Sequence, residues 1–255
     1  MNLLEGKTGL VCGIANKRSI AWAIARSAHG AGAKLAVTYQ NDRTEEAVRS
    51  LAADIDCDTV LPLDVTVPAQ LEAAAASIGA KGGRIDFLVH CLAFADKNDL
   101  EGQFVDTSFD GFRTALEVSA YSLVSLCRAL RPVISKNASV LTLSYLGAER
   151  AVPHYNVMGV AKAALESAVR YLALDLGPEG IRVNAISAGA VNTLSARGIR
   201  DFSQMLDAVA TRAPLQRNVT QEEIGDAAVF LMSDLSRAVT GEILHVDCGY
   251  HCVGF

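Results

Sequence analysis

Two tyrosines and a lysine between residues 144 and 165 have the types and spacing for proton-transfer chemistry. Tyr145 and Tyr155 are ten residues apart, and Lys162 follows Tyr155 by seven. Residues i and i+7 of a helix lie within roughly 20° of one another, two turns apart. We therefore expect Tyr155 and Lys162 to share a helix face, with the small Gly159 leaving room for the lysine stem. A protonated tyrosine can donate a hydrogen bond, and a nearby ammonium lowers the cost of negative charge on it.

The elements that must position these residues can be read from a series of apolar runs. The runs are rich in β-branched residues and span 8–13, 34–39, 59–65, 85–93, 138–145, 181–189 and 241–247, with Ala-rich helical segments between them. Continuous apolar strands that alternate with helices predict a parallel sheet covered on both faces. We expect a single Rossmann-type, doubly wound α/β domain of about seven strands over residues 1–255. The irregular segment 190–218 follows the sixth strand and is predicted to be a substrate-binding lid.

Composition limits the classes of partner. The chain has 255 residues, 51% of them hydrophobic, and a net charge of −5, which gives no electrostatic footprint for nucleic acid or an anionic membrane. No run reaches the roughly 18 apolar residues of a membrane span, and no signal sequence is recognisable. Six cysteines without CxxC pairs are typical of a reduced cytoplasm. We expect a cytoplasmic protein whose partners are small molecules or acidic carrier proteins.

The loop after the first predicted strand could bind the diphosphate of a dinucleotide. Gly13 ends the strand, and Ser19, Ile20 and Ala21 open a helix. Backbone N–H groups at such a turn can face a pyrophosphate, and Ser19 could cap the helix or donate to a phosphate. The segment is not a GxGxxG fingerprint, so an ordinary strand–helix turn is an equal alternative at this point.

Residues at the ends of the next strands could complete a cofactor site. Gln40 stands where an acidic residue would bind ribose hydroxyls and an arginine would bind a 2′-phosphate. Its neutral amide favours NADH, while Arg43 keeps NADPH open as the less favoured cofactor. Asp64 could accept the adenine amino group or cap the following helix. Ala93 and Ala95 would let the backbone approach a ribose or nicotinamide, or would only allow tight packing.

Taken together, the motifs resemble one group of short-chain dehydrogenases/reductases over nearly the whole chain. They are the Gly13-to-Ala21 loop, Gln40, Asp64-Val65, LTLSYLGAERAVPHYNVMGVAKAALE (141–166), GPEGIRVNAISAG (177–189), TLSARGIRDF (193–202) and HVDCGY (245–250). This pattern is similar to the NADH-dependent enoyl-acyl-carrier-protein reductases of the FabI type. Most of the wider superfamily instead has Tyr-x3-Lys with a serine thirteen residues before the tyrosine; those positions here are Gly159 and Thr142.

The resemblance implies a reaction and its residues. The trans-2 double bond of an enoyl thioester on acyl carrier protein would be reduced by NADH, as the last step of type II fatty-acid elongation. Tyr155 would hydrogen-bond the forming enolate, Lys162 would hold the nicotinamide ribose, and Tyr145 would line the acyl site as a proton donor or a pocket residue. The implied cofactor-binding residues are Gly13, Ser19, Ile20, Gln40, Asp64, Val65, Leu92, Lys162, Val191, Asn192, Thr193, Leu194 and Ser195. The implied substrate-binding residues are Ala95, Tyr145, Tyr155, Phe202 and Met205.

The resemblance also implies a homotetramer formed through the helices around 109–131 and 155–175. The second helix is apolar around much of its circumference, which the residues alone explain by burial on more than one side. The sequence departs from the family at Ala190, Asn192, Cys91-Leu92 and Cys248, where proline, a basic residue, Ser-Ile and glycine are usual. Alanine in place of proline frees φ at the hinge of the predicted lid.

Two alternatives stay open at this stage. A carbonyl or 3-oxoacyl reductase on the same fold could use Thr142 in place of the missing serine, although Gly159 stands where its lysine is expected. A non-catalytic NAD(H)-sensing protein would keep the dinucleotide loop but lose Tyr155 or Lys162. No metal site is predicted, because His90 and His154 have no second ligand at metal spacing and fit a core and a helix-start position.

Overall fold

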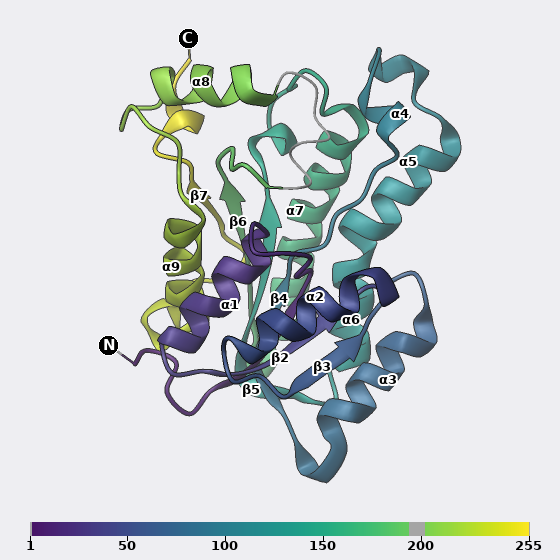
Figure 1. The fold of residues 1–255 in the computed structure, drawn as a ribbon, viewed down its shortest axis with the longest axis vertical. Helices are drawn as coiled ribbons and strands as arrows, with labels where there is room; N and C mark the ends of the chain where they lie inside the picture. The colour runs from purple at the N-terminus through teal and green to yellow at the C-terminus, as the bar shows by residue number, and fades with distance from the viewer. Residues whose placement is uncertain (1, 194–201, 255) are drawn as a thin grey trace.

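A parallel sheet forms the centre of the molecule (Figure 1). The computed structural model describes residues 2–193 and 202–254, and within them seven strands pair in the order β3-β2-β1-β4-β5-β6-β7. The strands are β1 Thr8–Cys12, β2 Lys34–Tyr39, β3 Thr59–Pro62, β4 Ile85–His90, β5 Ile134–Ser144, β6 Arg182–Ala188 and β7 Ile243–Val246. Every adjacent pair is parallel. The predicted doubly wound sheet is therefore confirmed, with its strand order reversing between β1 and β4.

Helices cover both faces of the sheet. One face carries α1 (Ile20–Gly30), α2 (Asp42–Ala53) and α9 (Gln221–Met232), and the other carries α3 (Pro68–Gly79), α6 (Ser122–Leu130) and α7 (Asn156–Leu176). Helices α4 (Lys97–Leu100), α5 (Phe109–Leu116) and α8 (Phe202–Arg212) lie at the upper end of the view in Figure 1. A π-helical turn, Glu117–Tyr121, joins α5 to α6. Among the described residues, no helix is both long and apolar enough to cross a membrane.

Each strand contributes to two cores, which explains the uninterrupted apolar runs. Val11 and Val89 pack with Trp22 under α1, α2 and α9, whereas the adjacent Leu10 and Leu88 pack toward α6 and α7. Successive side chains of a strand point to opposite faces, and both faces here are covered. Completely burying one such aliphatic side chain contributes about 1.5–3 kcal/mol to folding. These two cores hold the strand ends rigidly at the edge where the loops converge.

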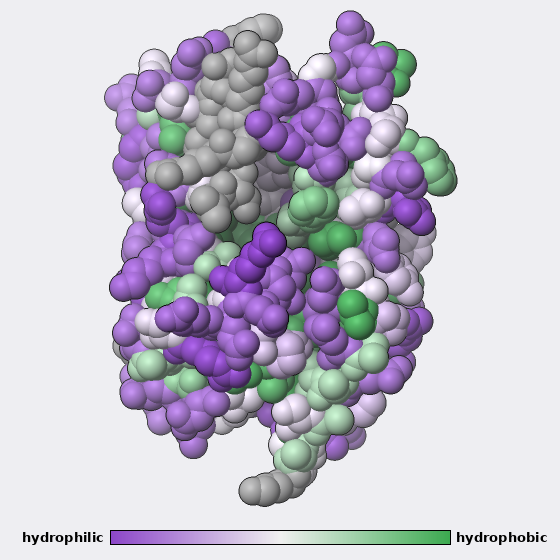
Figure 2. Space-filling model, turned by 45° about the vertical axis from the view of Figure 1, so that its right-hand side comes forward, coloured by the Kyte–Doolittle hydropathy of each residue, from purple (hydrophilic) through white to green (hydrophobic). Residues whose placement is uncertain are grey.

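The surface seen in Figure 2 is mostly hydrophilic, with a hollow in its upper half that hydrophobic residues border. The hollow lies at the end of the molecule where the loops after the strands meet. In open α/β sheets, ligands bind outside the carboxyl ends of the strands. This end of the sheet is therefore where a site is expected.

Candidate active site

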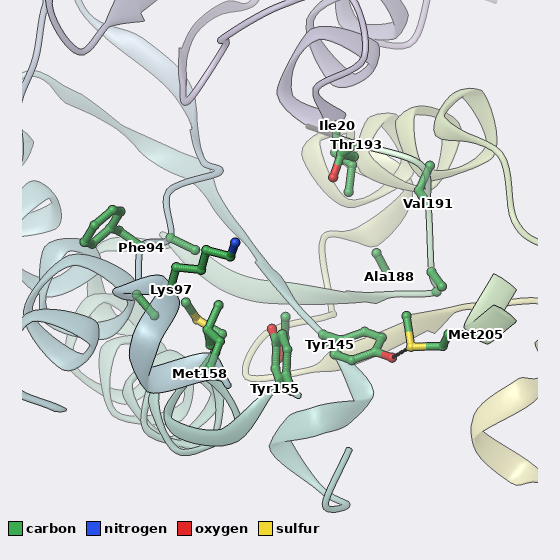
Figure 3. Close-up of a pocket in the computed structure, with 16 residues that line it drawn as sticks. Ile20, Phe94, Lys97, Tyr145, Tyr155, Met158, Ala188, Val191, Thr193 and Met205 are labelled. Carbon is green, nitrogen blue, oxygen red and sulfur yellow. Dashed lines mark hydrogen bonds between the residues drawn. The ribbon is translucent and has the colours of Figure 1, made fainter. Parts of the chain in front are cut away.

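A cavity of about 410 Å³ lies at the carboxyl ends of the strands (Figure 3). We call it the active-site cavity. Its described lining is Ile20, Ala93, Phe94, Ala95, Lys97, Leu100, Ser144, Tyr145, Tyr155, Met158, Ala188, Gly189, Ala190, Val191, Thr193 and Met205. Seven of these were predicted as site residues: Ile20, Ala95, Tyr145, Tyr155, Val191, Thr193 and Met205. The lining is largely apolar, so water inside it would find few partners.

The two tyrosines meet edge to face in this cavity. Their ring centroids are 5.0 Å apart and the ring planes are inclined by 68°. Tyr145 directly follows β5, and Tyr155 directly precedes α7, so the two cores hold both residues through their elements. The ten residues from Tyr145 to Tyr155 thus form the connection from the end of β5 to the start of α7.

Two glycines set the position of Tyr155. A Cβ on Gly147 would come within 2.4 Å of the Tyr155 ring, and a Cβ on Gly159 would come within 2.8 Å of the Gly147 backbone oxygen. Both contacts are too short for real carbon atoms. Gly159 therefore allows the short 3-10 turn Leu146–Ala148 to pack against α7. The sequence had suggested a different role, which was to leave space for the side chain of Lys162.

The backbone on either side of Tyr155 is strained. His154 and Asn156 have φ of 62° and 37°, in the left-handed region that non-glycine residues seldom adopt. The Asn156 side chain donates to the backbone oxygens of Leu100 and Gly102, each at 3.3 Å. These bonds fasten the residue after Tyr155 to the loop that lines the other side of the cavity. Strain of this kind persists where the surroundings over-determine a conformation, and it clusters at functional sites.

Burial keeps both phenols protonated. Loss of solvent raises the pKa of Tyr145 to about 12, and the neighbouring Tyr250 adds to the rise. For Tyr155, burial and then Tyr145 raise the pKa well above the ordinary value for tyrosine. The Tyr145 hydroxyl also donates to the sulfur of Met205, at 3.8 Å. At neutral pH the cavity therefore presents two hydrogen-bond donors and no phenolate.

Lys162 lies behind the cavity, on the first turns of α7. It is buried, and its Nζ donates to the backbone oxygen of Leu143 at 2.6 Å. Burial lowers the pKa of its ammonium to about 8, and Cys91 and Glu166 oppose the shift. Lys162 lies within α7, whereas Tyr155 is the N-cap residue before the helix, so the two do not share a helix as predicted. The hydrogen bond of Lys162 goes to the strand backbone and not to the Tyr155 hydroxyl.

Thr142, the residue thirteen positions before Tyr155, does not reach the cavity. It is completely buried, and its hydroxyl donates to the backbone oxygen of His90 at 3.1 Å. The two ring nitrogens of His90 lie 2.8 Å from the hydroxyls of Thr142 and Ser122. Burial, followed by the charge of Lys162, lowers the pKa of His90 to about 3, so the ring is neutral. His90 is a core histidine, as its sequence position indicated.

The predicted cofactor residues lie along one edge of the sheet. Gly13, Gln40, Asp64, Val65 and Leu92 each follow the last residues of a strand, β1 to β4. Among these and the α1 residues, Ile20 is the one that lines the active-site cavity. Lys162 and Asn192 are not among the lining residues either. Leu194 and Ser195 lie outside the described residues, as does the side chain of Phe202, whose backbone begins α8.

The α1 end of this edge fits a diphosphate. Gly13 has φ of 98°, and a Cβ there would come within 2.1 Å of the Cys91 backbone oxygen. Ser19 is at the N-cap position of α1, but its hydroxyl donates to the Asn16 backbone oxygen at 2.8 Å and makes no capping bond. The capping alternative for Ser19 is therefore wrong, while donation to a phosphate stays a prediction. First-turn N–H groups without a side-chain cap suit an anion.

Asp64 does not cap a helix. Helix α3 begins at Pro68, and the N-cap residue is Val67. Proline is favoured at the first helical position because it has no N–H to satisfy, which moves the helix start beyond the aspartate. One carboxylate oxygen of Asp64 instead accepts from the backbone N–H and the hydroxyl of Thr66, at 2.9 and 2.6 Å. The capping alternative for Asp64 is wrong, while the adenine alternative stays a prediction.

Several lining residues were not found from the sequence. Phe94, Lys97 and Leu100 come from the loop and short helix after β4, where no periodic pattern marks them. Met158 stands three residues after Tyr155, and this helical spacing could have identified it. In Figure 3, Phe94 and Lys97 lie on one side of the tyrosines and Met205 on the other, while Ile20 and Thr193 lie across the cavity.

Comparison with known proteins decides the family. A family model described as Enoyl-(Acyl carrier protein) reductase matches residues 13–251, which include both tyrosines and Lys162. The chain belongs to the enoyl-acyl-carrier-protein reductase family. The family prediction made from the motifs is confirmed.

Relatives and solved structures agree with this family over the full length. The NADH-type enoyl-acyl-carrier-protein reductase FabI of Bacillus cereus is 56% identical over 256 residues, with 100% of both chains covered. The FabI of Bacillus subtilis is 52% identical over 250 residues, with 97% of each covered. The crystal structure of the Bacillus cereus reductase with NADP+ and indole naphthyridinone superposes with a TM-score of 0.98, at 55% identity and 100% coverage of both chains.

Proposed function

We propose that the chain reduces the trans-2 double bond of enoyl thioesters carried on acyl carrier protein, with NADH as the reductant. This reaction is the last step of type II fatty-acid elongation. The observation that carries the proposal is the pair of partly buried, protonated tyrosines, with ring centroids 5.0 Å apart, in an apolar cavity. The names of the full-length relatives support the same activity.

The chemistry of an enoyl thioester explains why the spacing of Tyr155 and Lys162 differs from the Tyr-x3-Lys pattern of the wider superfamily. In the reduction of a ketone, the proton goes to the oxygen on the carbon that accepts hydride, whereas an enoyl thioester accepts hydride at C3 and develops negative charge on the thioester oxygen. Tyr155 would donate a hydrogen bond to that oxygen, and its raised pKa keeps the proton in place beforehand. Tyr145 lies beside it and would shape the thioester site or donate a second bond. The apolar surroundings strengthen such bonds because they exclude water.

The residues along the sheet edge fit a dinucleotide. NADH supplies the hydride when bound. The uncapped start of α1 and the close Gly13 turn would hold the diphosphate, and the exposed Gln40 would meet the adenosine ribose. The residues proposed to complete the cofactor site are Ser19, Ile20, Asp64, Val65, Leu92, Lys162, Val191, Asn192 and Thr193. Gln40 cannot neutralise a 2′-phosphate, so we propose a preference for NADH over NADPH.

The alternative 3-oxoacyl reductase lacks support in this geometry. Its serine would have to reach a substrate carbonyl, but Thr142 is completely buried and its hydroxyl is bonded to His90. Nothing in the position of Thr142 directs it into the active-site cavity. We therefore favour reduction of the carbon–carbon double bond.

A homotetramer is part of the proposal. Large apolar side chains are exposed on α7 at Val160, Tyr171 and Leu174, and on the adjoining α5–α6 segment at Phe109 and Tyr121. Spacings of 11 and 14 residues from Val160 return to nearly the same helix face. Exposed apolar patches of this kind mark association sites. The sequence predicted assembly of a cytoplasmic enzyme through the same two helical segments, 109–131 and 155–175.

The decisive experiment follows NADH oxidation with trans-2-enoyl and 3-oxoacyl thioesters of equal chain length, with NADPH in parallel. We expect turnover of the enoyl substrate with NADH, and a loss of about 10²- to 10⁴-fold in kcat for Tyr155→Phe. Tyr171→Phe is the matched control, because it removes an exposed phenol from α7, the helix that Tyr155 directly precedes. Turnover of the 3-oxoacyl substrate alone would refute the proposal, and dinucleotide binding without any turnover would favour a sensor.

A further inference from the structure

A second cavity lies beside the active-site cavity. Its volume is about 550 Å³, and its lining includes Tyr145, Arg150, His154, Met205, Arg212 and Tyr250. Tyr145 and Met205 line both cavities, and the bond from the Tyr145 hydroxyl to the Met205 sulfur joins them in the shared wall (Figure 3). The two cavities are therefore neighbours, separated by two side chains.

The charge of the second cavity differs from that of the protein as a whole. Two arginines and a histidine line it, and none of its described lining residues carries a carboxylate, although the chain has a net charge of −5. Arg212 is exposed at the last turn of α8 and forms no ion pair with a described residue. Arg150 donates to the backbone oxygens of His251 and Val253, at 2.7 and 3.2 Å, which are neutral acceptors. Within the described part of the chain, neither guanidinium therefore forms an ion pair with a carboxylate.

The end of the active-site cavity away from the second cavity is apolar. Phe94, Ala95, Leu100 and Met158 make it apolar, and its one described cation, Lys97, lies 3.7 Å from the carboxylate of Glu101. An alkyl chain would be favoured at this end because burial of apolar surface stabilises it. A thioester held at the tyrosines would then direct its other substituent past Tyr145 and Met205.

We propose that the second cavity binds the phosphopantetheine arm of the acyl carrier, with its phosphate between Arg212 and Arg150. This inference rests on the proposed function. It adds that the acyl chain lies at the Phe94 end of the active-site cavity and the arm of the carrier lies in the second cavity. An arm of this kind has a thioester at one end, an amide chain in the middle and a phosphate at the other end. Arginine binds phosphate through several N–H groups in a planar fork, which suits an uncompensated guanidinium.

The test compares one trans-2-enoyl group on three thiols: phosphopantetheine, pantetheine without the phosphate, and N-acetylcysteamine. For the wild-type protein we expect the phosphate to raise kcat/KM about fivefold, the size of one exposed charge contact. Arg212→Gln should reduce the ratio of phosphorylated to unphosphorylated kcat/KM to about one. Lys97→Gln, at the other end of the substrate, should leave that ratio near fivefold.

The outcomes separate this inference from the proposed function. A ratio that persists in Arg212→Gln, or that is lost in Lys97→Gln, overturns the assigned direction. Enoyl thioesters of coenzyme A and of acyl carrier protein share the arm, so both should lose activity in Arg212→Gln. A loss confined to the coenzyme A thioester would show that the arginine binds the nucleotide phosphates and overturns the inference. If the wild-type protein turns over none of the thioesters, the proposed function itself fails.

Discussion

The Nζ atom of Lys162 lies 2.6 Å from the backbone oxygen of Leu143, two residues before Tyr145. A buried ammonium is thereby held against the strand end that carries one of the two tyrosines. Burial lowers its pKa to about 8, below the value of 10.5 for a solvated lysine. Between these two pH values the unfolded chain binds more protons than the folded one. The contribution of Lys162 to the free energy of unfolding therefore rises with pH through this window.

The same pKa predicts the pH dependence of cofactor use. If the Lys162 ammonium holds the nicotinamide ribose, kcat/KM for NADH should fall above about pH 8, by about tenfold per pH unit, as the amine loses its proton. Ionisation of Tyr155 should not contribute to the fall near pH 8, because burial raises the pKa of its phenol. The measurement is a pH profile of kcat/KM at saturating enoyl substrate. In Lys162→Arg the guanidinium stays charged, so the fall near pH 8 should disappear. An unchanged profile in this variant would assign the ionisation to another group.

The sequence predicted the sheet and its site edge because both depend on local patterns. Val11 and Leu10 face different cores, so the strands are apolar throughout and easily recognised. Strand ends in a parallel sheet share an edge, so Gln40 and Leu92 could be placed there without coordinates. The family motifs placed Tyr145 at the end of a strand and Lys162 in a helix, as the structure has them, whereas Tyr155 lies just before that helix.

What the sequence could not predict depends on long-range contacts. Phe94 lines the active-site cavity because the Ser119 hydroxyl, in the π-helical turn, accepts from its N–H at 3.0 Å and donates to its backbone oxygen at 3.1 Å. No periodicity records a bond between residues so far apart. The preference of Lys162 for the Leu143 oxygen is likewise a tertiary contact. The capping alternative for Asp64 failed for a local reason, since Pro68 sets the helix start.

Gly147→Ala should damage both catalysis and stability. The added methyl would lie 2.4 Å from the Tyr155 ring, so the ring must move away from its place beside Tyr145. We expect kcat to fall at least tenfold, with a loss of about 1–3 kcal/mol in the free energy of unfolding from overpacking. Enoyl turnover and urea unfolding measure the two effects. Gly30→Ala is the control, because a methyl there meets no atom within 4 Å and should leave kcat unchanged.

Thr142→Val should affect stability and leave the reaction intact. Removing the hydroxyl leaves a ring nitrogen of the buried His90 without its partner, at a cost of about 1–3 kcal/mol in the free energy of unfolding. Ser139→Ala removes another buried hydroxyl from β5, bonded to the Leu231 backbone oxygen, and should be destabilising without a role in the cavity. In both variants kcat for the enoyl thioester should stay within about threefold of wild type. A hundredfold loss in Thr142→Val alone would contradict this prediction and give Thr142 a role in the enoyl reaction.

The exposed face of α7 should control assembly. Leu174 is 73% exposed and lies on the same side of the helix as Tyr171 and Val160. A charge placed there would have to be desolvated in any interface between copies, so Leu174→Glu should shift the protein to smaller species in analytical ultracentrifugation. Leu235→Glu introduces the same charge at a comparably exposed leucine outside α5–α7. This variant should sediment like the wild-type protein. Equal sedimentation of the two variants would argue that α7 is not the interface. Because Leu174 is near the end of α7 and Tyr155 precedes its start, dissociation with retained enoyl turnover would further show that each copy contains a complete active site.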